Sequence, residues 1–213
     1  QMCIRDRVDG GDGADTLIGN AGDDTLLGGS GSDTLIGGGG ADVVDGGQDD
    51  DLLELDGSAG VTAEGGDGRD TVVLVGETNE ASLSGVEVVT GSAGDDSVTV
   101  STNDIASVSG GSGIDDVTLT DASGNTVDLA GVEVIAGSAG DDILTVTDDT
   151  SVTVDGGDGS DTLTGNVGDD TLLGGTGSDT LIGGDGSDVI DGGSGADMPV
   201  SYTHLRAHET RFY

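Results

Sequence analysis

The side chains of this chain that could do chemistry are almost all carboxylates. Its 213 residues include 43 Asp and Glu against 5 Lys and Arg, a formal net charge of −38. Between Val8 and Met198 there is no Cys, His, Lys or aromatic residue, and Arg69 is the one base. This segment therefore lacks the residues for catalytic triads, Schiff bases, thiol chemistry and phosphate-binding P-loops. We expect no catalytic site in it, and its charge argues against nucleic acid and anionic lipid as partners.

The aspartates recur with a fixed spacing of nine residues in two arrays, which start at Gly10 and Gly156. Repeats such as GGDGADTLI and GGTGSDTLI carry Asp in the sixth place and an aliphatic residue in the eighth. Ten phased copies exclude coincidence. The sixth-position residues are Asp15, Asp24, Asp33, Asp42, Asp51, Asp161, Asp170, Asp179, Asp188 and Asp197.

The elements that must position these carboxylates are tight turns and very short strands. Glycine at the first, second and fourth places allows a tight turn, and the Thr-Leu-Ile-like end predicts a strand with one inward aliphatic side chain. Two nonapeptides make a coil of 18 residues, and neighbouring coils lie about 4.8 Å apart. This stacks Asp15, Asp33 and Asp51 on one edge, with Asp24 and Asp42 on the other. In the second array the same stacking groups Asp161, Asp179 and Asp197, and it groups Asp170 with Asp188 on the opposite edge.

Stacked carboxylates repel one another unless a cation lies between them, and the arrays contain no Lys or Arg to supply it. The turns offer only oxygen, from carboxylates and glycine-rich backbone. Flexible coordination by six to eight oxygens suits Ca²⁺. Zinc and copper are disfavoured because His and Cys are absent, and Mg²⁺ is disfavoured because it demands rigid octahedral geometry.

Longer repeats separate the two arrays. The motifs GGDGRD, GGSGID and GGDGSD begin at residues 65, 110 and 156, and the similar stretches from Leu83 and Leu129 are 46 residues apart. Alternation such as Val98-Thr99-Val100 predicts strands, and no window shows helical periodicity. We therefore predict an all-β fold, a parallel β-roll or β-solenoid of stacked calcium-binding repeats. Its parts are a nonapeptide array at 8–57, longer repeats of about 46 residues at 58–155, and a second array at 156–198.

The tandem pattern GGxGxDxUx resembles the RTX nonapeptide, the haemolysin-type calcium-binding repeat of bacterial secreted proteins. The resemblance implies that six-residue loops hold Ca²⁺ between successive coils, through the sixth-position Asp of both coils and through loop carbonyls. It pairs Asp15 with Asp33, Asp24 with Asp42, Asp161 with Asp179, Asp170 with Asp188, and Asp179 with Asp197. The glycines implied as carbonyl ligands are Gly11, Gly13, Gly29, Gly31, Gly157, Gly159, Gly175, Gly177, Gly184 and Gly186.

Some positions depart from this pattern. Asn20 and Asn166 replace the second glycine, which is a mild change because Asn tolerates left-handed backbone. Asp49 replaces a fourth glycine and sets the Asp33/Asp51 pair apart. The middle repeats offer matching ligands without assignable partner loops, namely Asp70, Asp96, Asp115 and Asp142. We expect the aspartates at other loop positions to be solvated surface residues, namely Asp12, Asp23, Asp158, Asp169 and Asp185.

The resemblance implies a secreted or cell-surface protein that is exported by a type I secretion apparatus and folds on binding Ca²⁺ outside the cell. Without cation, the composition favours disorder. Two alternatives stay open. The segment could be the stalk or spacer of a large surface adhesin, or an accessory module of a secreted hydrolase whose catalytic domain lies elsewhere.

Both ends differ in composition from the rest of the chain. A DNA strand that encodes Met2–Arg7 has a reverse complement that encodes Pro199–His204, so both look like a translated sequencing adapter. We therefore expect residues 1–7 and 199–213 to be non-native scars, and we expect the native protein to continue past both ends.

Overall fold

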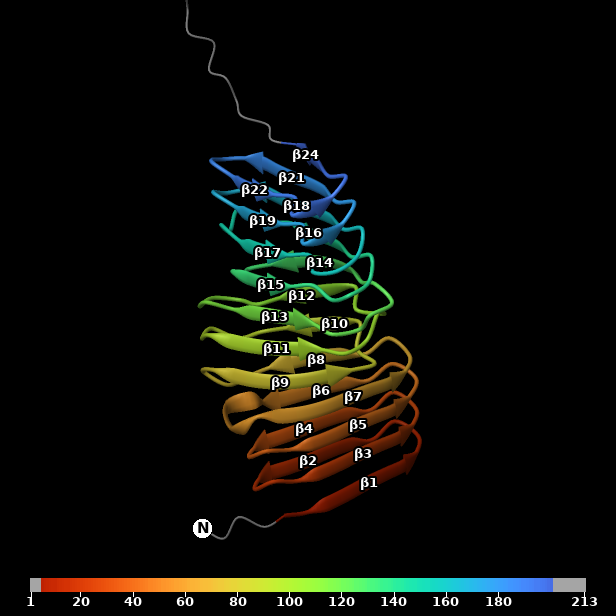
Figure 1. The fold of residues 1–213 in the computed structure, drawn as a ribbon. Helices are drawn as coiled ribbons and strands as arrows, with labels where there is room; N and C mark the ends of the chain where they lie inside the picture. The colour runs from red at the N-terminus through yellow and green to blue at the C-terminus, as the bar shows by residue number, and fades with distance from the viewer. Residues whose placement is uncertain (1–4, 201–213) are drawn as a thin grey trace, which may run out of the picture.

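The computed structural model describes residues 5–200, which form a stack of short parallel strands in two facing sheets (Figure 1). Each of the two sheets has 11 strands, and consecutive strands of the chain alternate between them. The first sheet contains β1 (Arg7–Asp12), β3 (Thr25–Ser30), β5 (Val43–Gln48), β7 (Val61–Asp67), β9 (Asn79–Ser84), β11 (Asp96–Val100), β13 (Asp116–Leu119), β15 (Val134–Ala136), β17 (Thr153–Asp155), β19 (Thr171–Leu173) and β22 (Val189–Asp191).

The second sheet contains β2 (Thr16–Ala21), β4 (Thr34–Gly39), β6 (Leu52–Asp56), β8 (Thr71–Leu74), β10 (Val88–Thr90), β12 (Ser107–Ser109), β14 (Thr126–Ala130), β16 (Ile143–Val146), β18 (Thr162–Val167), β21 (Thr180–Asp185) and β24 (Met198–Val200). A small third sheet pairs β20 (Thr176–Gly177) with β23 (Ser194–Gly195). Residues 5–200 contain no α-helix, and their one helical element is the 3₁₀ turn η1 (Gly57–Ala59). The predicted all-β parallel solenoid is therefore confirmed.

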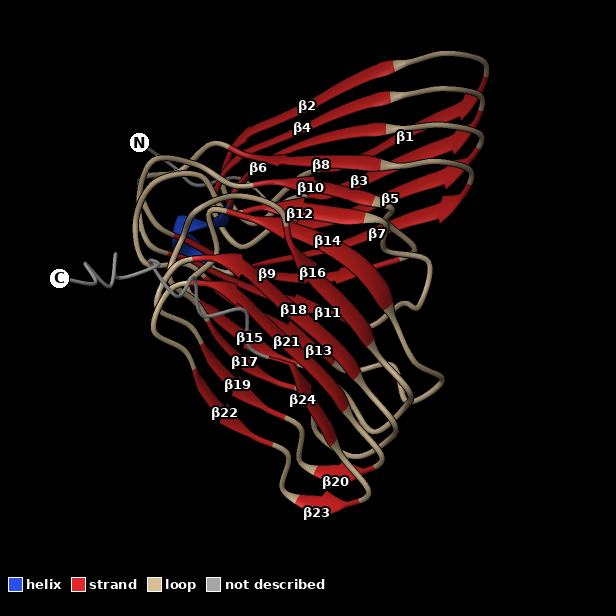
Figure 2. Cartoon of the chain, turned by 90° about the horizontal axis from the view of Figure 1, so that it is seen from above, coloured by secondary structure: helices blue, strands red, loops and turns tan. Residues whose placement is uncertain are grey.

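The strand register reproduces the predicted coil of 18 residues in both arrays. Thr16 pairs with Thr34 across β2 and β4, and Thr162 pairs with Thr180 across β18 and β21. Parallel strands cannot be joined by a two-residue hairpin, so each coil passes through the opposite sheet before it returns. Seen from above, successive coils are rotated about the long axis of the stack, so that the strands fan out (Figure 2).

The core is a narrow column of aliphatic side chains between the sheets. Within a strand the burial alternates, so that in β2 Leu17 is buried while its neighbours Thr16 and Ile18 are exposed. The same position supplies Leu26, Leu35 and Val44 in the next three strands, and one continuous cluster runs from Leu17 to Leu181. A single coil buries only a few such residues, each contributing about 1.5–3 kcal/mol. Its stability therefore depends on the coils above and below.

The middle repeats continue the same solenoid with coils of unequal length. Ala81 pairs with Val61 of β7 and Val98 of β11, which are offsets of 20 and 17 residues. The two similar stretches that begin at Leu83 and Leu129 start in β9 and β14, which belong to different sheets. Their 46-residue spacing therefore covers five strands, or two and a half coils, and the same sequence recurs on opposite sheets.

The described ends join the stack as strands. β1 begins at Arg7, and β24 includes Pro199 and Val200, which pair with β21. These residues fall within the segments predicted to be adapter scars, and the rest of those segments includes residues 1–4 and 201–213, which lie outside the described residues. In residues 5–200 no helix is long and apolar enough to cross a membrane.

Candidate metal-binding turns

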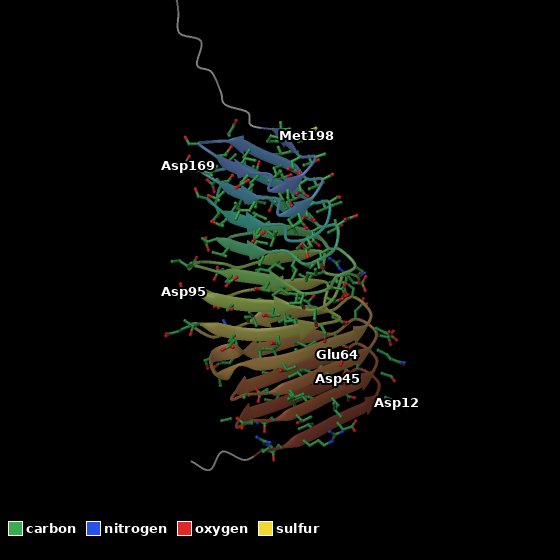
Figure 3. The ribbon with its side chains drawn as sticks, in the orientation of Figure 1. Asp12, Asp45, Glu64, Asp95, Asp169 and Met198 are labelled. Atoms are coloured by element: carbon green, nitrogen blue, oxygen red, sulfur yellow. The ribbon has the colours of Figure 1, made fainter. Side chains whose placement is uncertain are left out.

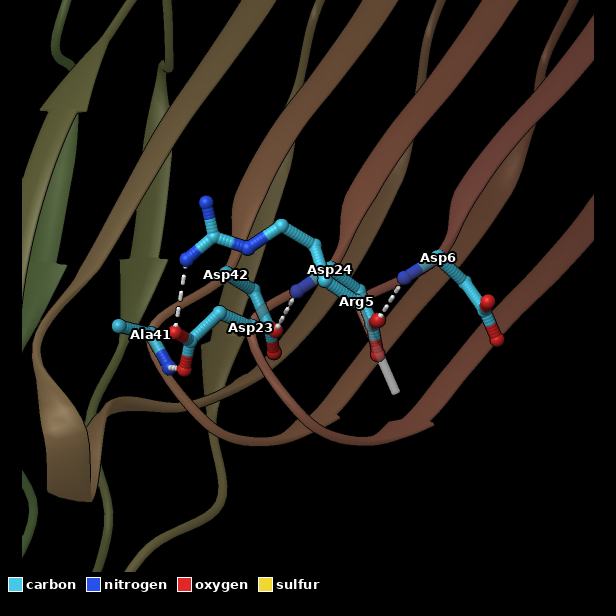
Figure 4. Close-up of polar contacts among 6 residues, drawn as sticks. All are labelled: Arg5, Asp6, Asp23, Asp24, Ala41 and Asp42. Atoms are coloured by element: carbon cyan, nitrogen blue, oxygen red, sulfur yellow. Dashed lines mark hydrogen bonds and ion pairs between the residues drawn. The ribbon is translucent and has the colours of Figure 1, made fainter. Parts of the chain in front are cut away.

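The sixth-position aspartates lie in the turns that connect the two sheets, and each contacts its counterpart one coil away. The N–H of Asp15 donates to Oδ1 of Asp33 (2.7 Å), and the N–H of Asp33 donates to Oδ1 of Asp51 (2.7 Å). On the opposite edge, the N–H of Asp24 donates to Oδ1 of Asp42 (2.9 Å), as Figure 4 shows. One carboxylate oxygen of each Asp after the first coil thus accepts a hydrogen bond from the backbone of the preceding coil.

All five expected pairs lie side by side in successive coils. In the second array the corresponding N···O distances are 2.9 Å for Asp161 to Asp179, 3.2 Å for Asp170 to Asp188, and 3.2 Å for Asp179 to Asp197. The Asp33/Asp51 contact has the same geometry, and Asp49 adopts φ = 72° at the place of the missing glycine. We call the row of sixth-position residues joined by these N–H to carboxylate contacts on each edge the carboxylate ladder. The Asp49 substitution leaves this ladder intact.

The structure also assigns neighbours to the middle aspartates, which the sequence could not. Asp70 follows Asp51 on its edge, Asp115 follows Asp96, and Asp161 follows Asp142, with N···O distances of 2.8 Å each. The ladder is interrupted on one edge where η1 replaces a turn, and there the N–H of Gly57 donates to Oδ1 of Asn79 (2.8 Å).

Two glutamates and two asparagines also belong to the ladder, and none of the four was predicted from the sequence pattern. Glu87 accepts from the N–H of Asp70 (2.6 Å), and Glu133 accepts from the N–H of Asp115 (2.8 Å). Asn79 and Asn125 stand in the sixth-position place, where their N–H groups donate to Asp96 and Asp142. The signal was their 46-residue spacing, because Glu87 and Glu133 fall at the same point of the two similar stretches.

The second carboxylate oxygen of most of these aspartates has no partner. Oδ2 is buried and without a hydrogen bond among the described residues in eleven of them. An unpaired buried polar atom is costly, and a charged one is costlier still. These oxygens belong to Asp15, Asp24, Asp33, Asp42, Asp51, Asp70, Asp115, Asp161, Asp170, Asp179 and Asp188.

The first glycine of each repeat leaves the space that this oxygen occupies. A Cβ on Gly174 would lie 2.5 Å from Oδ2 of Asp179 and 2.7 Å from the carbonyl oxygen of Gly192 in the next coil. The same conflict exists between Gly10 and Asp15, at 2.9 Å. Only glycine therefore fits at this position.

The second and fourth positions need glycine for a different reason, because the backbone there has positive φ. The ten glycines expected as carbonyl ligands all have φ between 92° and 145°. Asn20 and Asn166 adopt φ = 74° and 76° at the second position, which agrees with the expected tolerance of asparagine. These glycines lie in the same turns as the aspartates, and ligation by their carbonyl groups remains a prediction.

Burial and like charge weaken the acidity of several carboxylates. Burial raises the pKa of Asp70 to about 6, where the hydrogen bond from Asp51 opposes the change and the charges of Asp51 and Glu87 add to it. Burial likewise raises the pKa of Asp161 to about 6, together with the charges of Asp142 and Asp179. Burial also raises the pKa of four further sixth-position residues, namely Asp42, Asp51, Asp115 and Asp170.

This donor set fits a hard divalent cation. The turns present unpartnered anionic oxygens next to backbone carbonyls and offer neither nitrogen nor sulfur ligands. Within residues 5–200 no three acidic, His or Cys side chains gather into one metal-binding group. A cation would therefore draw most of its ligands from the backbone, as the glycine-rich turns allow.

The aspartates expected to be solvated are exposed, yet three of them also bridge coils. Asp23 accepts from the N–H of Ala41 (3.2 Å), which lowers its pKa together with the exposed ion pair to Arg5 (Figure 4). Asp169 points outward from its turn, as does Asp95 (Figure 3), and accepts from the N–H of Ser187 (2.9 Å). Asp158 accepts from the hydroxyl of Thr176. Asp12 and Asp185 are exposed.

Comparison with known families decides the identity of these repeats. The family described as RTX calcium-binding nonapeptide repeat (4 copies) matches at 5–35, 18–53, 27–61, 129–150, 153–181 and 164–199, more than half of the chain. The chain belongs to the RTX calcium-binding nonapeptide repeat family. No curated protein matches it. The RTX matches cover both arrays, and they extend into the second middle repeat at 129–150, so the chain is an RTX calcium-binding repeat segment in a β-roll.

Proposed function

We propose that this RTX segment is a calcium-driven folding module, which is unfolded without the ion and becomes the stacked β-solenoid when Ca²⁺ fills its turns. The observation that carries the proposal is the set of eleven buried carboxylate oxygens without a partner. With a net charge of −38 and only a narrow aliphatic core, repulsion should outweigh burial in the metal-free chain.

In the proposed sites, bound Ca²⁺ supplies the positive charge that the arrays lack. Asp15 and Asp33 would hold one ion between their coils, and Asp161 and Asp179 would hold another. The chain contributes pre-stacked carboxylates, since Oδ1 of Asp33, Asp161 and Asp179 is already fixed by an N–H of the preceding coil. Oδ2 is thereby left facing the turn.

The proposed place of action is outside the cell, because extracellular modules bind Ca²⁺ with affinities in the millimolar range. In a calcium-poor cytosol the sites would be empty, and charge repulsion would keep the chain extended for a type I export apparatus. The absence of Cys between Val8 and Met198 agrees with this, since metal rather than disulfides would stabilise the fold.

A circular dichroism titration of the full chain tests the proposal. In excess chelator we expect a coil spectrum, and millimolar Ca²⁺ should convert it to a β-rich one. Mg²⁺ at the same concentration serves as the control and should produce little change, because it keeps its waters and prefers rigid octahedral sites. A β-rich spectrum in chelator would overturn the proposal.

A role as a spacer in a larger surface protein is a second candidate. It is favoured by the unbroken stacking of all 11 strands in each sheet, with one continuous core from Leu17 to Leu181. Such a stack would hold its two ends at a fixed separation once Ca²⁺ is bound. Force spectroscopy tests this, because the spacer role requires unfolding forces that rise with calcium.

A further inference from the structure

Among the turns that end in a sixth-position Asp, two turns of the middle repeats have serine rather than glycine or asparagine at the second position. The turn between β10 and β11 and the turn between β15 and β16 both have the sequence GSAGDD, with Ser92 and Ser138 at that position. Their sixth-position residues, Asp96 and Asp142, are buried. Neither is among the aspartates with an unpartnered Oδ2.

In the first of these turns, hydrogen-bond donors of the protein contact both carboxylate oxygens of Asp96. Oδ2 of Asp96 accepts from the N–H of Ser92 (2.7 Å), and Oδ1 accepts from the N–H and the Nδ2 of Asn79 (3.1 and 2.7 Å). The Ser92 hydroxyl lies 3.1 Å from both oxygens. An ionised carboxylate has about four lone-pair positions, and here it meets four donor groups.

The orientation of the Asn79 side-chain amide is fixed by contacts other than those to Asp96. Oδ1 of Asn79 accepts from the N–H of Gly57 (2.8 Å) and the N–H of Gly76 (3.2 Å), so its Nδ2 must face Asp96. Nδ2 also donates to the hydroxyl of Ser92 (3.0 Å). Asn79, Ser92 and Asp96 therefore form one closed hydrogen-bond network.

The second turn repeats these contacts on the opposite edge of the solenoid. Asp142 accepts from the N–H of Ser138 (2.8 Å) and from the N–H and Nδ2 of Asn125 (2.6 and 2.8 Å). The Ser138 hydroxyl lies 3.3 and 3.1 Å from its two oxygens. The same contacts to the aspartate thus form twice, on opposite edges of the solenoid, although Oδ1 of Asn125, unlike that of Asn79, has no hydrogen-bond partner among the described residues.

The backbone of these two turns also follows a different path. The glycines at the second and fourth positions of the other turns have positive φ, as do Asn20, Asp49 and Asn166 where they replace one. Ser92, Gly94, Ser138 and Gly140 are not among the residues with positive φ. Asparagine at the second position does not have this effect, because Asp24 and Asp170, in turns with Asn20 and Asn166, keep an unpartnered Oδ2. Serine at the second position, together with Asn79 or Asn125 in the preceding coil, therefore distinguishes these two turns.

We infer that Ser92 and Ser138 close their turns to calcium, so that the Asn–Ser–Asp networks replace the ion and the position-two residue decides which turns of the solenoid bind Ca²⁺. A cation at Asp96 or Asp142 would have to displace N–H donors from a filled carboxylate, whereas elsewhere it meets a free oxygen. The inference rests on the proposed function and removes Asp96 and Asp142 from the expected ligands.

Counting bound calcium on full-length variants at saturation, by equilibrium dialysis and metal analysis, tests the inference. Asp96→Asn and Asp142→Asn should keep the wild-type number of ions. The matched changes one coil further on, Asp115→Asn and Asp161→Asn, should each lose at least one. Circular dichroism in calcium verifies that the variants are folded.

The reverse change gives a second readout. Ser92→Gly should open its turn and add one ion, while Ser112→Gly, the same substitution in the exposed part of the next turn on that edge, should add none. The inference is overturned if Asp96→Asn or Asp142→Asn loses an ion as its neighbour does, or if Ser92→Gly adds none. A wild-type chain that binds no calcium would instead overturn the proposed function itself.

Discussion

The two oxygens of most sixth-position carboxylates in the RTX turns, with Asp96 and Asp142 as exceptions, have separate roles. Oδ1 holds the N–H of the preceding coil, and Oδ2 is buried without a partner. A change of Asp to Asn can therefore keep the first contact and remove the charge from the second. This separates metal binding from the hydrogen-bond ladder at the level of one residue.

Asp33→Asn should weaken calcium binding because Asp33 contacts both Asp15 and Asp51. We expect the calcium midpoint to rise about tenfold, which corresponds to about 1.4 kcal/mol. Asp12→Asn, which removes the same charge from an exposed site, should shift it far less. Isothermal titration of both variants measures this, and equal shifts would contradict the assignment of Asp33.

The raised pKa values of Asp70 and Asp161, both about 6, predict an acid-induced gain of structure without metal. Their unfolded value is 3.8, so folding takes up protons between pH 3.8 and about 6. The metal-free fold should therefore gain stability as pH falls through 6 and lose it as pH rises. Circular dichroism in metal-depleted buffer should show more β structure at pH 4.5 than at pH 7, and the opposite trend would contradict these pKa shifts.

For the individual turns and strands, the conformation of each turn depends on which positions require glycine and which can also hold another residue. The nine-residue period, the strand positions and the 18-residue coil could be predicted because every nonapeptide places glycine, Asp and an aliphatic residue at the same positions. The partner turns of the middle repeats could not be predicted from the sequence. Their coils vary in length, and Glu87 takes the place of an Asp in the ladder with a longer side chain. The closed Ser92 turn also escaped prediction, since it depends on Asn79 from the previous coil.

Gly174→Ala should destabilise the calcium-bound fold by about 1–3 kcal/mol, because its Cβ would overlap Oδ2 of Asp179 and the carbonyl of Gly192. Gly39→Ala is the matched control, since a Cβ there meets nothing within 4 Å. Thermal unfolding in saturating Ca²⁺ should lower the melting temperature of the first variant only. Similar melting temperatures would contradict the crowding argument.

The stability of the whole molecule depends on repulsion among its negative charges, which opposes folding, and on burial of its narrow aliphatic core, which favours folding. The formal charge of −38 is spread over a stack in which each coil depends on its neighbours. Filling the turns should therefore change the dimensions of the entire chain. Small-angle scattering should show the radius of gyration falling from about 50 Å in chelator toward the roughly 17 Å of a compact chain of this length. A radius that does not respond to calcium would contradict this.

The most direct measurement is a crystal structure with calcium, with the ions located by anomalous scattering. The account predicts ions in the turns next to the unpartnered Oδ2 atoms, between pairs such as Asp15 and Asp33 or Asp161 and Asp179. It predicts none at Asp96 and Asp142. Ions found only on the outer acidic surface, with the buried Oδ2 atoms still unpartnered, would contradict it.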